Sequence, residues 1–218
     1  MELTYLAHSC FKLSTKNLNI IIDPYEPTET GYKLPKQGAD VVLVTHEHFD
    51  HNYIEGVSDY RLLINSPGEY EVGGVFVQGF ASFHDDVQGE LRGKNTMYLI
   101  DIEGVNVLHL GDLGHLLDKE TVEKLPDIDV LLVPVGGTYT IDAKLASKVV
   151  ADLAPTVVVP MHYQTQSPTK LSSELAPLSK FLEEMGAEQE YEQLDVLKMA
   201  KANEVSEDTK VVVLTPKY

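Results

Sequence analysis

Short runs of Val, Ile and Leu recur along the whole chain, and most of them are apolar at every position rather than at every second one. Unbroken apolar runs of this length are typical of strands that are buried on both faces of a sheet. Glu103 and Gly104 separate two of the runs, which predicts a tight antiparallel hairpin there. The sequence predicts strands at residues 20–22, 41–44, 62–64, 75–77, 97–102, 105–110, 130–135, 157–159 and 211–214.

Helical periodicity is concentrated in the second half of the chain. Asp142 can cap a helix whose apolar residues recur on one face, because its carboxylate can accept hydrogen bonds from the first free backbone N–H groups. Ser172 or Ser173 can cap another helix that continues to Gly186, with Pro177 tolerated in its first turns. Two sheets with these helices outside them would account for the order of the elements.

The length of 218 residues is enough for one large domain, so we expect a single domain over residues 1–218. No segment approaches the apolar length needed to cross a bilayer, and we expect no membrane association. The N-terminal MELTYLAHSCFKL has neither a basic opening nor a long apolar core, and the lone Cys10 cannot form an internal disulfide. These features favour a cytoplasmic protein.

The formal net charge of -17 restricts the partners of the protein. A nucleic-acid binder needs a basic face that offsets phosphate charge, and this chain has only the arginines Arg61 and Arg92. We therefore expect no nucleic-acid partner. Arg92 and Lys94 lie close together in GELRGKN and could form a local anion site, or they could be a solvated loop. The sequence leaves the oligomeric state open, and a homo-oligomer is compatible with it.

The stretch VVLVTHEHFDHNY ends an apolar run with a cluster of metal-binding side chains, His46, His48, Asp50 and His51. On a tight turn after a strand, such side chains can converge from two directions, so the turn could serve two metal ions. Imidazole and carboxylate ligands suit zinc, and also manganese or iron, whereas a thiolate site is excluded by the single cysteine. The alternative, a polar surface turn, does not explain why four metal-binding side chains cluster at the end of a buried strand. We therefore predict metal binding.

Three further candidates occupy the same kind of position, at the end of an apolar run and before a polar or glycine-containing loop. They are His84 in VQGFASFHDD, Asp112 in VLHLGDLGH and His162 in TVVVPMHYQ. Taken singly, each is more often a loop residue than a ligand. As a set, they extend the predicted metal site from one turn to the ends of several strands.

These motifs resemble those of the metallo-β-lactamase-fold superfamily of metal-dependent hydrolases. The pattern HxHxDH is present as HEHFDH, and the later ligand motifs as SFHD, HLGD and PMHY. The N-terminal AHSCF and IIIDPY are similar to the branch that contains ascorbate-6-phosphate lactonase. The resemblance implies an α/β fold, a four-layer αββα sandwich of two mixed β-sheets flanked by helices, with the site in a cleft at the sheet edges.

Carried over to this sequence, the resemblance implies two divalent ions. One would be held by His46, His48 and His84, the other by Asp50, His51 and His162, with Asp112 between them. Such a pair can lower the pKa of a shared water. The resemblance therefore implies a binuclear hydrolase that uses a metal-bridging hydroxide to cleave an ester, lactone or phosphoester bond in a small molecule. Asp50 and Asp112 would be the catalytic carboxylates.

Other residues are candidates for supporting roles. Asp23 in IIIDPY matches an early aspartate of the family that supports the metal turn, although it could simply form a turn before Pro24. His8 matches a family position near the cleft and is a substrate-side candidate. His115 and Tyr139 could also reach the substrate, as could the pair Arg92 and Lys94.

Three residues near the motifs have open roles. Asp85 and Asp86 follow His84 directly, and either could ligate a metal or carry a proton. His109 lies within an apolar run and could be a hydrogen-bonded core histidine.

Two other functions stay open. A phosphodiesterase acting on RNA or DNA would use the same metals, but the scarcity of Arg and Lys leaves little surface to track phosphates. A non-catalytic ligand-binding or regulatory protein could also keep this fold. The complete ligand set argues against decay of the site, yet it does not by itself demonstrate turnover.

Overall fold

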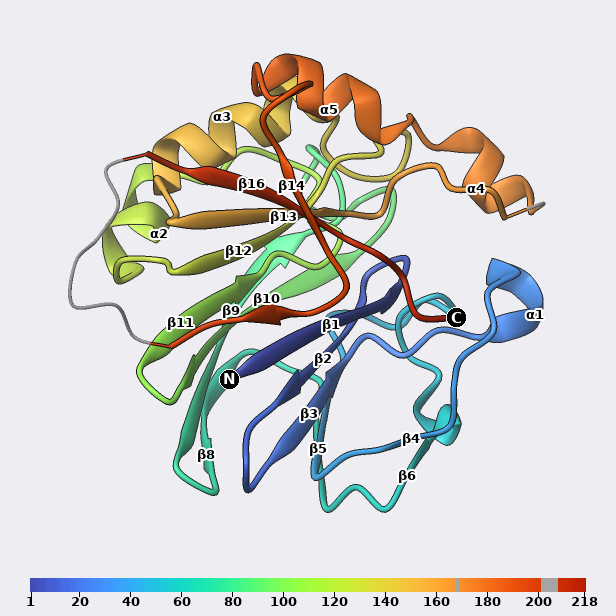
Figure 1. The fold of residues 1–218 in the computed structure, drawn as a ribbon, viewed down its shortest axis with the longest axis vertical. Coiled ribbons are helices and arrows are strands. Elements are labelled where there is room, and N and C mark those ends of the chain that lie inside the picture. The colour runs from blue at the N-terminus through green and yellow to red at the C-terminus, as the bar shows by residue number, and fades with distance from the viewer. Residues whose placement is uncertain (168, 201–207) are drawn as a thin grey trace.

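Two mixed β-sheets lie face to face at the centre of the protein (Figure 1). The computed structural model describes residues 1–167, 169–200 and 208–218. The six-stranded sheet has the order β15 (Leu197–Lys198), β1 (Glu2–Ala7), β2 (Cys10–Ser14), β3 (Asn19–Ile22), β5 (Val41–Leu43) and β7 (Leu62–Ile64). The eight-stranded sheet has the order β14 (Glu192–Leu194), β16 (Lys210–Leu214), β13 (Val157–Met161), β12 (Val130–Pro134), β11 (Val105–His109), β10 (Lys94–Ile102), β9 (Val75–Phe83) and β8 (Gly68–Val72). A short pair, β4 (Gln37–Gly38) and β6 (Val57–Ser58), forms a third sheet.

Helices cover the outer face of the eight-stranded sheet. They are α2 (Lys119–Lys124), α3 (Ala143–Leu153) and α5 (Leu178–Glu184) (Figure 1). The outer face of the six-stranded sheet is covered more thinly, by buried side chains such as Tyr25 and Tyr32 and by the 3₁₀ turn Ile54–Gly56. The helices α1 (Pro27–Thr30) and α4 (Lys170–Glu174) lie near each other at one end of the sandwich. The predicted α/β sandwich of two mixed sheets is confirmed.

The unbroken apolar runs are explained by burial on both faces of each sheet. In β3, Ile20 and Ile22 pack into the cluster between the two sheets, whereas Ile21 packs into the outer cluster. In β12, Leu132 faces the other sheet and Leu131 faces the helices. Because successive side chains of a strand point to opposite faces, a strand covered on both sides has no place for polar residues.

The predicted hairpin and the predicted helix after Asp142 are both present. Glu103 and Gly104 have positive φ angles of 55° and 75°, and β10 pairs antiparallel with β11 around them. The Asp142 side chain accepts a hydrogen bond from the Leu145 N–H at 2.8 Å and begins α3. The local sequence was sufficient to predict the hairpin and the helix start, because each of them depends on residues that are neighbours in the chain.

The single helix predicted from Ser172 or Ser173 to Gly186 is wrong. The segment forms two helices, α4 with Thr169 as its N-cap and α5 with Pro177 as its N-cap. A residue before proline is disfavoured in the helical conformation, so the chain leaves the helix before Pro177. Backbone bonds fix the break, because the Ala176 N–H donates to the carbonyl of Gly136 at 2.7 Å.

Several strands lack an unbroken apolar run and were not predicted. β1 and β2 contain partly buried or exposed positions among their buried ones, and β8 has only partly buried and exposed positions. β14 and β15 lie in the polar segment 190–210, of which residues 201–207 lie outside the described part of the chain. Among the helices that the structure describes, none is long and apolar enough to cross a membrane.

Candidate metal centre

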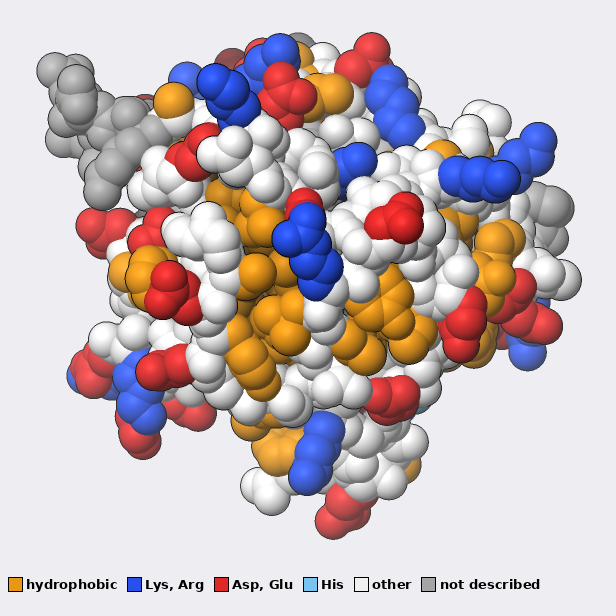
Figure 2. Space-filling view, turned by 90° about the horizontal axis from the view of Figure 1, so that it is seen from below, with side chains coloured by type: hydrophobic (Ala, Val, Ile, Leu, Met, Phe, Trp, Pro, Cys, Tyr) orange, Lys and Arg blue, Asp and Glu red, His pale blue; other side chains and the backbone are white. Residues whose placement is uncertain are grey.

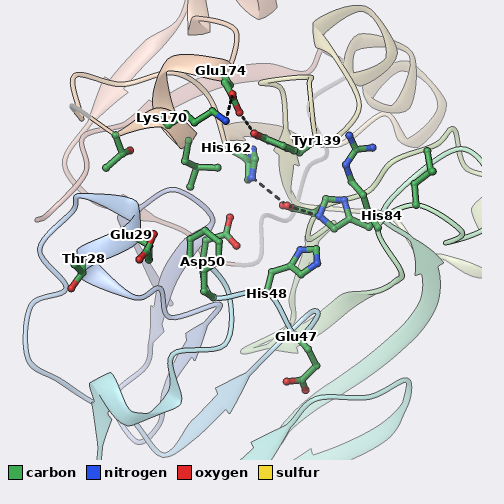
Figure 3. Close-up of a pocket in the computed structure, with 16 residues that line it drawn as sticks. Thr28, Glu29, Glu47, His48, Asp50, His84, Tyr139, His162, Lys170 and Glu174 are labelled. Atoms are coloured by element: carbon green, nitrogen blue, oxygen red, sulfur yellow. Dashed lines mark hydrogen bonds and ion pairs between the residues drawn. The ribbon is translucent and has the colours of Figure 1, made fainter.

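The predicted ligands meet where strands of both sheets end (Figure 3). The metal turn 46–51 follows β5 of the six-stranded sheet. His84, Asp112 and His162 follow β9, β11 and β13 of the eight-stranded sheet. Residues that are far apart in the sequence therefore come together at one end of the sandwich, which is where loops of such folds carry chemistry.

The backbone of the metal turn directs its side chains to two sides. The N–H groups of His51 and Asn52 both donate to the carbonyl of His48, at 2.9 and 3.0 Å, and close a tight turn. His46, Asp50 and His51 are buried, whereas His48 is exposed. This turn supplies ligands to two different groups.

The first group consists of His46, His48 and His84. Their ligand nitrogens all lie within 4.8 Å of one another. The ring of His84 lies 4.8 Å from that of His46 and 5.0 Å from that of His48, measured between centroids. We call this set the three-histidine group.

The second group consists of His8, Asp50, His51 and His162, whose ligand atoms also lie within 4.8 Å of one another. All four residues are buried. The Nε2 atom of His8 lies 3.0 Å from Oδ2 of Asp50, and the rings of His8 and His162 are 4.1 Å apart. We call this set the buried group. The structure therefore places His8 among side chains that could hold a metal ion, and His8 does not line the cavity as a substrate-side residue would.

Asp112 lies between the two groups. The distances from its Oδ2 atom to Nε2 are 3.2 Å for His84, 3.2 Å for His162, 3.3 Å for His51 and 3.9 Å for His46. The dashed lines in Figure 3 join this carboxylate to His84 on one side and to His162 on the other. One carboxylate oxygen thus faces imidazoles from both groups.

The chemistry of the donor atoms fits metal ions. Within the described residues, the Nε2 atoms of His46, His51 and His162 are buried without a hydrogen-bond partner, and so is Oδ1 of Asp112. Buried polar atoms are normally paired, so unpaired atoms pointing at one place indicate a missing partner. Divalent cations would satisfy both the nitrogen lone pairs and the carboxylate charges.

Protonation favours the same interpretation. Burial, followed by the neighbouring His51, lowers the pKa of His46 well below its usual value, which keeps this imidazole neutral. Burial works to raise the pKa of Asp112, but the facing His162 and His51 outweigh it and hold the pKa well below the usual value. A neutral imidazole and an ionised carboxylate are the forms that bind a metal.

Asp23 supports the metal turn from beneath, in the position predicted for it. Its carboxylate accepts hydrogen bonds from the N–H and the hydroxyl of Thr45, both at 2.8 Å, and lies 2.8 Å from Nδ1 of His51. Since a carboxylate accepts, His51 carries a proton on Nδ1 and directs its Nε2 at the cleft. The Thr45 oxygen, 3.0 Å from Nδ1 of His46, does the same for that ring.

Asn95 and Gly111 position Asp112, and the sequence reasoning missed both. The Asn95 side chain accepts from the Asp112 N–H at 3.0 Å and donates to the carbonyl of Leu110 at 2.9 Å. A Cβ atom on Gly111 would lie 2.3 Å from Oδ1 of Asn95, and Gly111 has a φ of 57°. Only glycine fits this approach. A polar residue early in the largely apolar strand β10 was the available signal for Asn95.

Asp85 holds a loop rather than a metal or a substrate. Its carboxylate accepts from the N–H groups of Val87, Gly89, Leu91 and Arg92, at distances of 2.7 to 3.0 Å. Burial works to raise the pKa of Asp85, but these four donors outweigh it and give a pKa of about 2. Asp86 is exposed and does not line the cleft.

A cavity of about 740 Å³ opens over the metal ligands. Its lining includes metal ligands from both groups, the apolar Phe49, Leu91 and Leu171, and the polar Glu29, Glu47, Arg92, Tyr139, Lys170 and Glu174. Lys170 and Glu174 come from α4, a segment in which no sequence pattern predicted a site. Tyr139 and Arg92, both predicted on the substrate side, are therefore in contact with the cavity.

The remaining candidates lie away from the cavity. Lys94 and His115 do not line it. His115 accepts a hydrogen bond from the Phe83 N–H at 3.2 Å, and its Nδ1 lies 2.8 Å from the Leu116 carbonyl. His109 has Nε2 2.9 Å from the Ser9 carbonyl and accepts from the Gly111 N–H at Nδ1. The geometry gives His109 and His115 roles in holding the loops together, and gives no support to a substrate contact by Lys94.

The fold and the ligand set are those of a metal-dependent hydrolase, and comparisons with known proteins agree. The family description "Beta-lactamase superfamily domain" matches residues 2–162, which include every predicted ligand. The chain therefore belongs to the metallo-β-lactamase superfamily of metal-dependent hydrolases.

Particular relatives support this placement. A UPF0173 metal-dependent hydrolase of Methanoregula boonei is 31% identical over 188 residues, which cover 76% of this chain and 83% of the relative. One from Lysinibacillus sphaericus is 29% identical over 198 residues, covering 77% and 87%. A crystal structure from Thermotoga maritima, of a protein inferred to be a Zn-dependent hydrolase of the same superfamily, has a TM-score of 0.77 at 38% identity and covers 98% of this chain and 97% of its own. None of the three is named an ascorbate-6-phosphate lactonase, and that finer resemblance stays a prediction.

Proposed function

We propose that the protein binds two divalent metal ions and hydrolyses an ester, lactone or phosphoester bond in a small molecule. The observation that carries the proposal is the position of Asp112, whose Oδ2 lies within 3.3 Å of Nε2 of both His84 and His162. Those two histidines belong to different ligand groups, so one carboxylate oxygen is suited to serve two ions. The nitrogen-rich set suits zinc, and manganese or iron are accepted by the same ligand types.

The side chains around the cleft are arranged to hold and activate such ions. Two bound ions would lower the pKa of a water held between them and polarise the bond under attack. Asp50 and Asp112 supply carboxylate oxygens in a buried setting, while the buried imidazoles supply nitrogen ligands. Asp23 and Thr45 keep Nε2 of His51 and His46 aimed at the cleft.

The cavity favours a small substrate over a nucleic acid. Its volume of about 740 Å³ is within the range of small-molecule sites, roughly 300 to 1,000 Å³. Glu29 and Glu47 line it, and the chain carries a net charge of -17, so a phosphate backbone would meet repulsion. The relatives that are named hydrolases speak against a purely regulatory role.

The test is turnover by protein that has been stripped of metal and then saturated with zinc or manganese. The substrates would be para-nitrophenyl acetate, a simple γ-lactone, para-nitrophenyl phosphate and bis(para-nitrophenyl) phosphate. We expect hydrolysis of at least one class, lost in the Asp112→Asn variant. Metal-saturated protein that turns over none of these classes, or an active Asp112→Asn variant, would contradict the proposal.

The shared core cluster, to which strands of both sheets contribute, supports one domain over residues 1–218. The single buried cysteine is compatible with a reducing cytoplasm. A homo-oligomer is also compatible with the structure, and gel filtration with light scattering would measure its size.

A further inference from the structure

His8 lies in a tight turn at a position where glycine is the usual residue. His8 and Ser9 connect β1 to β2, and Ala7 pairs with Cys10 across the turn. His8 has a positive φ of 56°, a conformation that glycine adopts without strain at the first position of two-residue hairpin turns. Residues held in such conformations cluster at functional sites. The side chain of His8 is therefore a candidate for a role of its own.

The His8 side chain reaches Asp50 of the metal turn. Its Nε2 atom lies 3.0 Å from Oδ2 of Asp50, and both residues are buried. A carboxylate only accepts hydrogen bonds, so Nε2 of His8 carries a proton and donates to Asp50. A protonated ring nitrogen has no lone pair left for a metal ion. The hydrogen bond also restrains the rotation of the Asp50 carboxylate, because it holds one of the two oxygens in place.

The nitrogen atoms of the neighbouring histidines are in a different state. Nε2 of His51 and both ring nitrogens of His162 are buried and have no hydrogen-bond partner among the described residues. Nε2 of His8 is not one of these unpaired atoms, because it faces Asp50. Unpaired buried nitrogens are the ones that await a metal ion. His8 therefore differs from His162, although the two rings lie only 4.1 Å apart.

The main chain of His8 holds His162, another member of the buried group. The His8 carbonyl accepts hydrogen bonds from the His162 N–H at 2.9 Å and from the Tyr5 hydroxyl at 2.8 Å. His8 follows β1 of the six-stranded sheet, whereas His162 follows β13 of the eight-stranded sheet. Figure 3 shows Asp50 and His162 both directed into the cavity. One residue thus links two members of the buried group that come from different sheets.

From these contacts we infer that His8 is a positioning residue of the metal centre, which donates from Nε2 to Asp50 and holds this carboxylate in the orientation that binds the ion of the buried group. A donor on a ligating carboxylate reduces the ordering that is required when the ion arrives, and so raises the affinity. His8 acts through Asp50 and not on the substrate, since it does not line the cavity. The inference rests on the metal binding of the proposed function.

Two amide substitutions separate this role from that of a direct ligand. The amide nitrogen of glutamine reaches the place of Nε2 of histidine, whereas that of asparagine ends near the place of Nδ1. Asparagine also suits a left-handed turn, so His8→Asn should fold. We expect His8→Asn to lower the affinity of the tighter zinc ion by about 10- to 100-fold, and His8→Gln to restore most of it. If His8 were a ligand, both variants would lose affinity alike, because an amide is a poor ligand for zinc.

Zinc titration against a competing chelator measures these affinities. Figure 2 shows exposed acidic side chains scattered over one face of the protein. Such carboxylates bind zinc only weakly, so a chelator of high affinity keeps them free of the ion. The melting temperature of each metal-free variant shows that it is folded.

A double-mutant cycle shows whether His8 acts through Asp50. Asp50→Ala removes a ligand and weakens the tighter ion by itself. In that background His8→Asn should cost little more, because the carboxylate that His8 orients is gone. The same substitution at His115, a histidine outside both ligand groups, is the matched control, and His115→Asn should leave the affinity of the tighter ion unchanged.

Nitrogen NMR of metal-loaded protein with labelled histidines locates the proton on His8, whose signals are assigned by their loss in His8→Asn. The inference predicts a proton on Nε2 of His8 and no coupling of this nitrogen to cadmium-113 when that ion replaces zinc. A cadmium coupling at His8, or equal losses in His8→Asn and His8→Gln that add to the loss in Asp50→Ala, would make His8 a ligand and overturn the inference. Zinc affinities that neither His8 variant changes would also overturn it.

These measurements separate the role of His8 from the proposed hydrolysis, because none of them requires turnover. Protein that binds zinc with the predicted dependence on His8, but hydrolyses no substrate, would support the inference and contradict the proposed reaction. An active enzyme in which His8→Asn keeps the full zinc affinity would overturn the inference and leave the hydrolase proposal intact. Protein that binds no metal ion would overturn both.

Discussion

The three-histidine group and the buried group offer a metal ion different surroundings. In the three-histidine group, His48 is exposed and every ligand is an imidazole, apart from the shared Asp112. In the buried group every side chain is buried, and Asp50 adds a carboxylate of its own. Asp23 fixes His51 from behind, and His8 lies 3.0 Å from Asp50.

Because the two groups differ in exposure and charge, we expect the two ions to bind with different affinities. More negative charge and a fixed geometry favour tight binding at the buried group, because less ordering is required when the ion arrives. An open site with a solvent-facing ligand can exchange its ion and admit a substrate. We expect the buried group to fill first and the three-histidine group to fill at higher metal concentration.

The largest effect should come from removing the residue that both groups share. Asp112→Asn keeps the size of the side chain but removes its charge, so both ions should bind weakly and turnover should fall by roughly a thousandfold or more. Elemental mass spectrometry and initial rates measure the two effects. An Asp112→Asn protein that keeps both ions would show that the groups do not depend on a common carboxylate.

The second largest effect should be on the metal affinity of one group at a time, in variants that each remove a ligand from a single group. His48→Gln should cost only the weaker ion, because it opens a group that is already exposed to solvent. His51→Gln should weaken the tighter ion, since it removes a ligand that lies 3.3 Å from Asp112 and is held by Asp23. Zinc titrations with a competing chelator resolve the two affinities. Equal losses from both variants would mean that the groups are not distinct.

A smaller effect on metal affinity should come from replacing Asp23, which supports the buried group through a contact with His51. Asp23→Asn should lower the affinity of the tighter ion by about 10- to 100-fold, the usual cost of losing a group that orients a ligand. The exposed Asp152 on α3 provides a matched control, and Asp152→Asn should change nothing. An affinity that is unchanged in Asp23→Asn would leave Asp23 as a turn residue only.

The smallest effect concerns the loop beside the three-histidine group. The folded-state pKa of Asp85, about 2, is below the usual 3.8, so its contribution to loop stability is present above about pH 4 and is lost as the pH falls toward 2. Hydrogen exchange of the amides of residues 87–92 should show less protection, relative to the core strands, as the pH falls through this range. In Asp85→Asn the protection should be low already at neutral pH. Equal protection in both proteins would contradict the anchoring role.

The sequence predicted those elements of the molecule that depend on residues close together in the chain. The apolar runs located the strands that both layers cover, and the hairpin at Glu103 and Gly104 followed from its turn chemistry. The predicted ligands could be recognised because four metal-binding side chains stand within the six positions 46–51, and three more follow other apolar runs. Their division into two groups came from the family resemblance, and the structure adds His8 to the predicted set of Asp50, His51 and His162.

The parts that escaped prediction depend on contacts between distant segments. The role of Asn95 exists only because β10 lies beside the loop at Gly111, a relation that no local pattern encodes. The meeting of Tyr139 with Glu174 joins the loop before α3 to α4. The place of His8 beside Asp50 spans residues far apart in the chain. Tertiary pairing of this kind is set by the packing of the whole fold.

In the proposed binuclear centre, one chain holds two metal ions, one at each ligand group. The most direct measurement is the number of zinc ions per chain, counted by elemental mass spectrometry as zinc is added back to chelator-stripped wild-type protein. We predict a first ion that binds tightly, a second that follows at higher zinc, and a plateau at two per chain. A plateau at one ion or none would contradict the account.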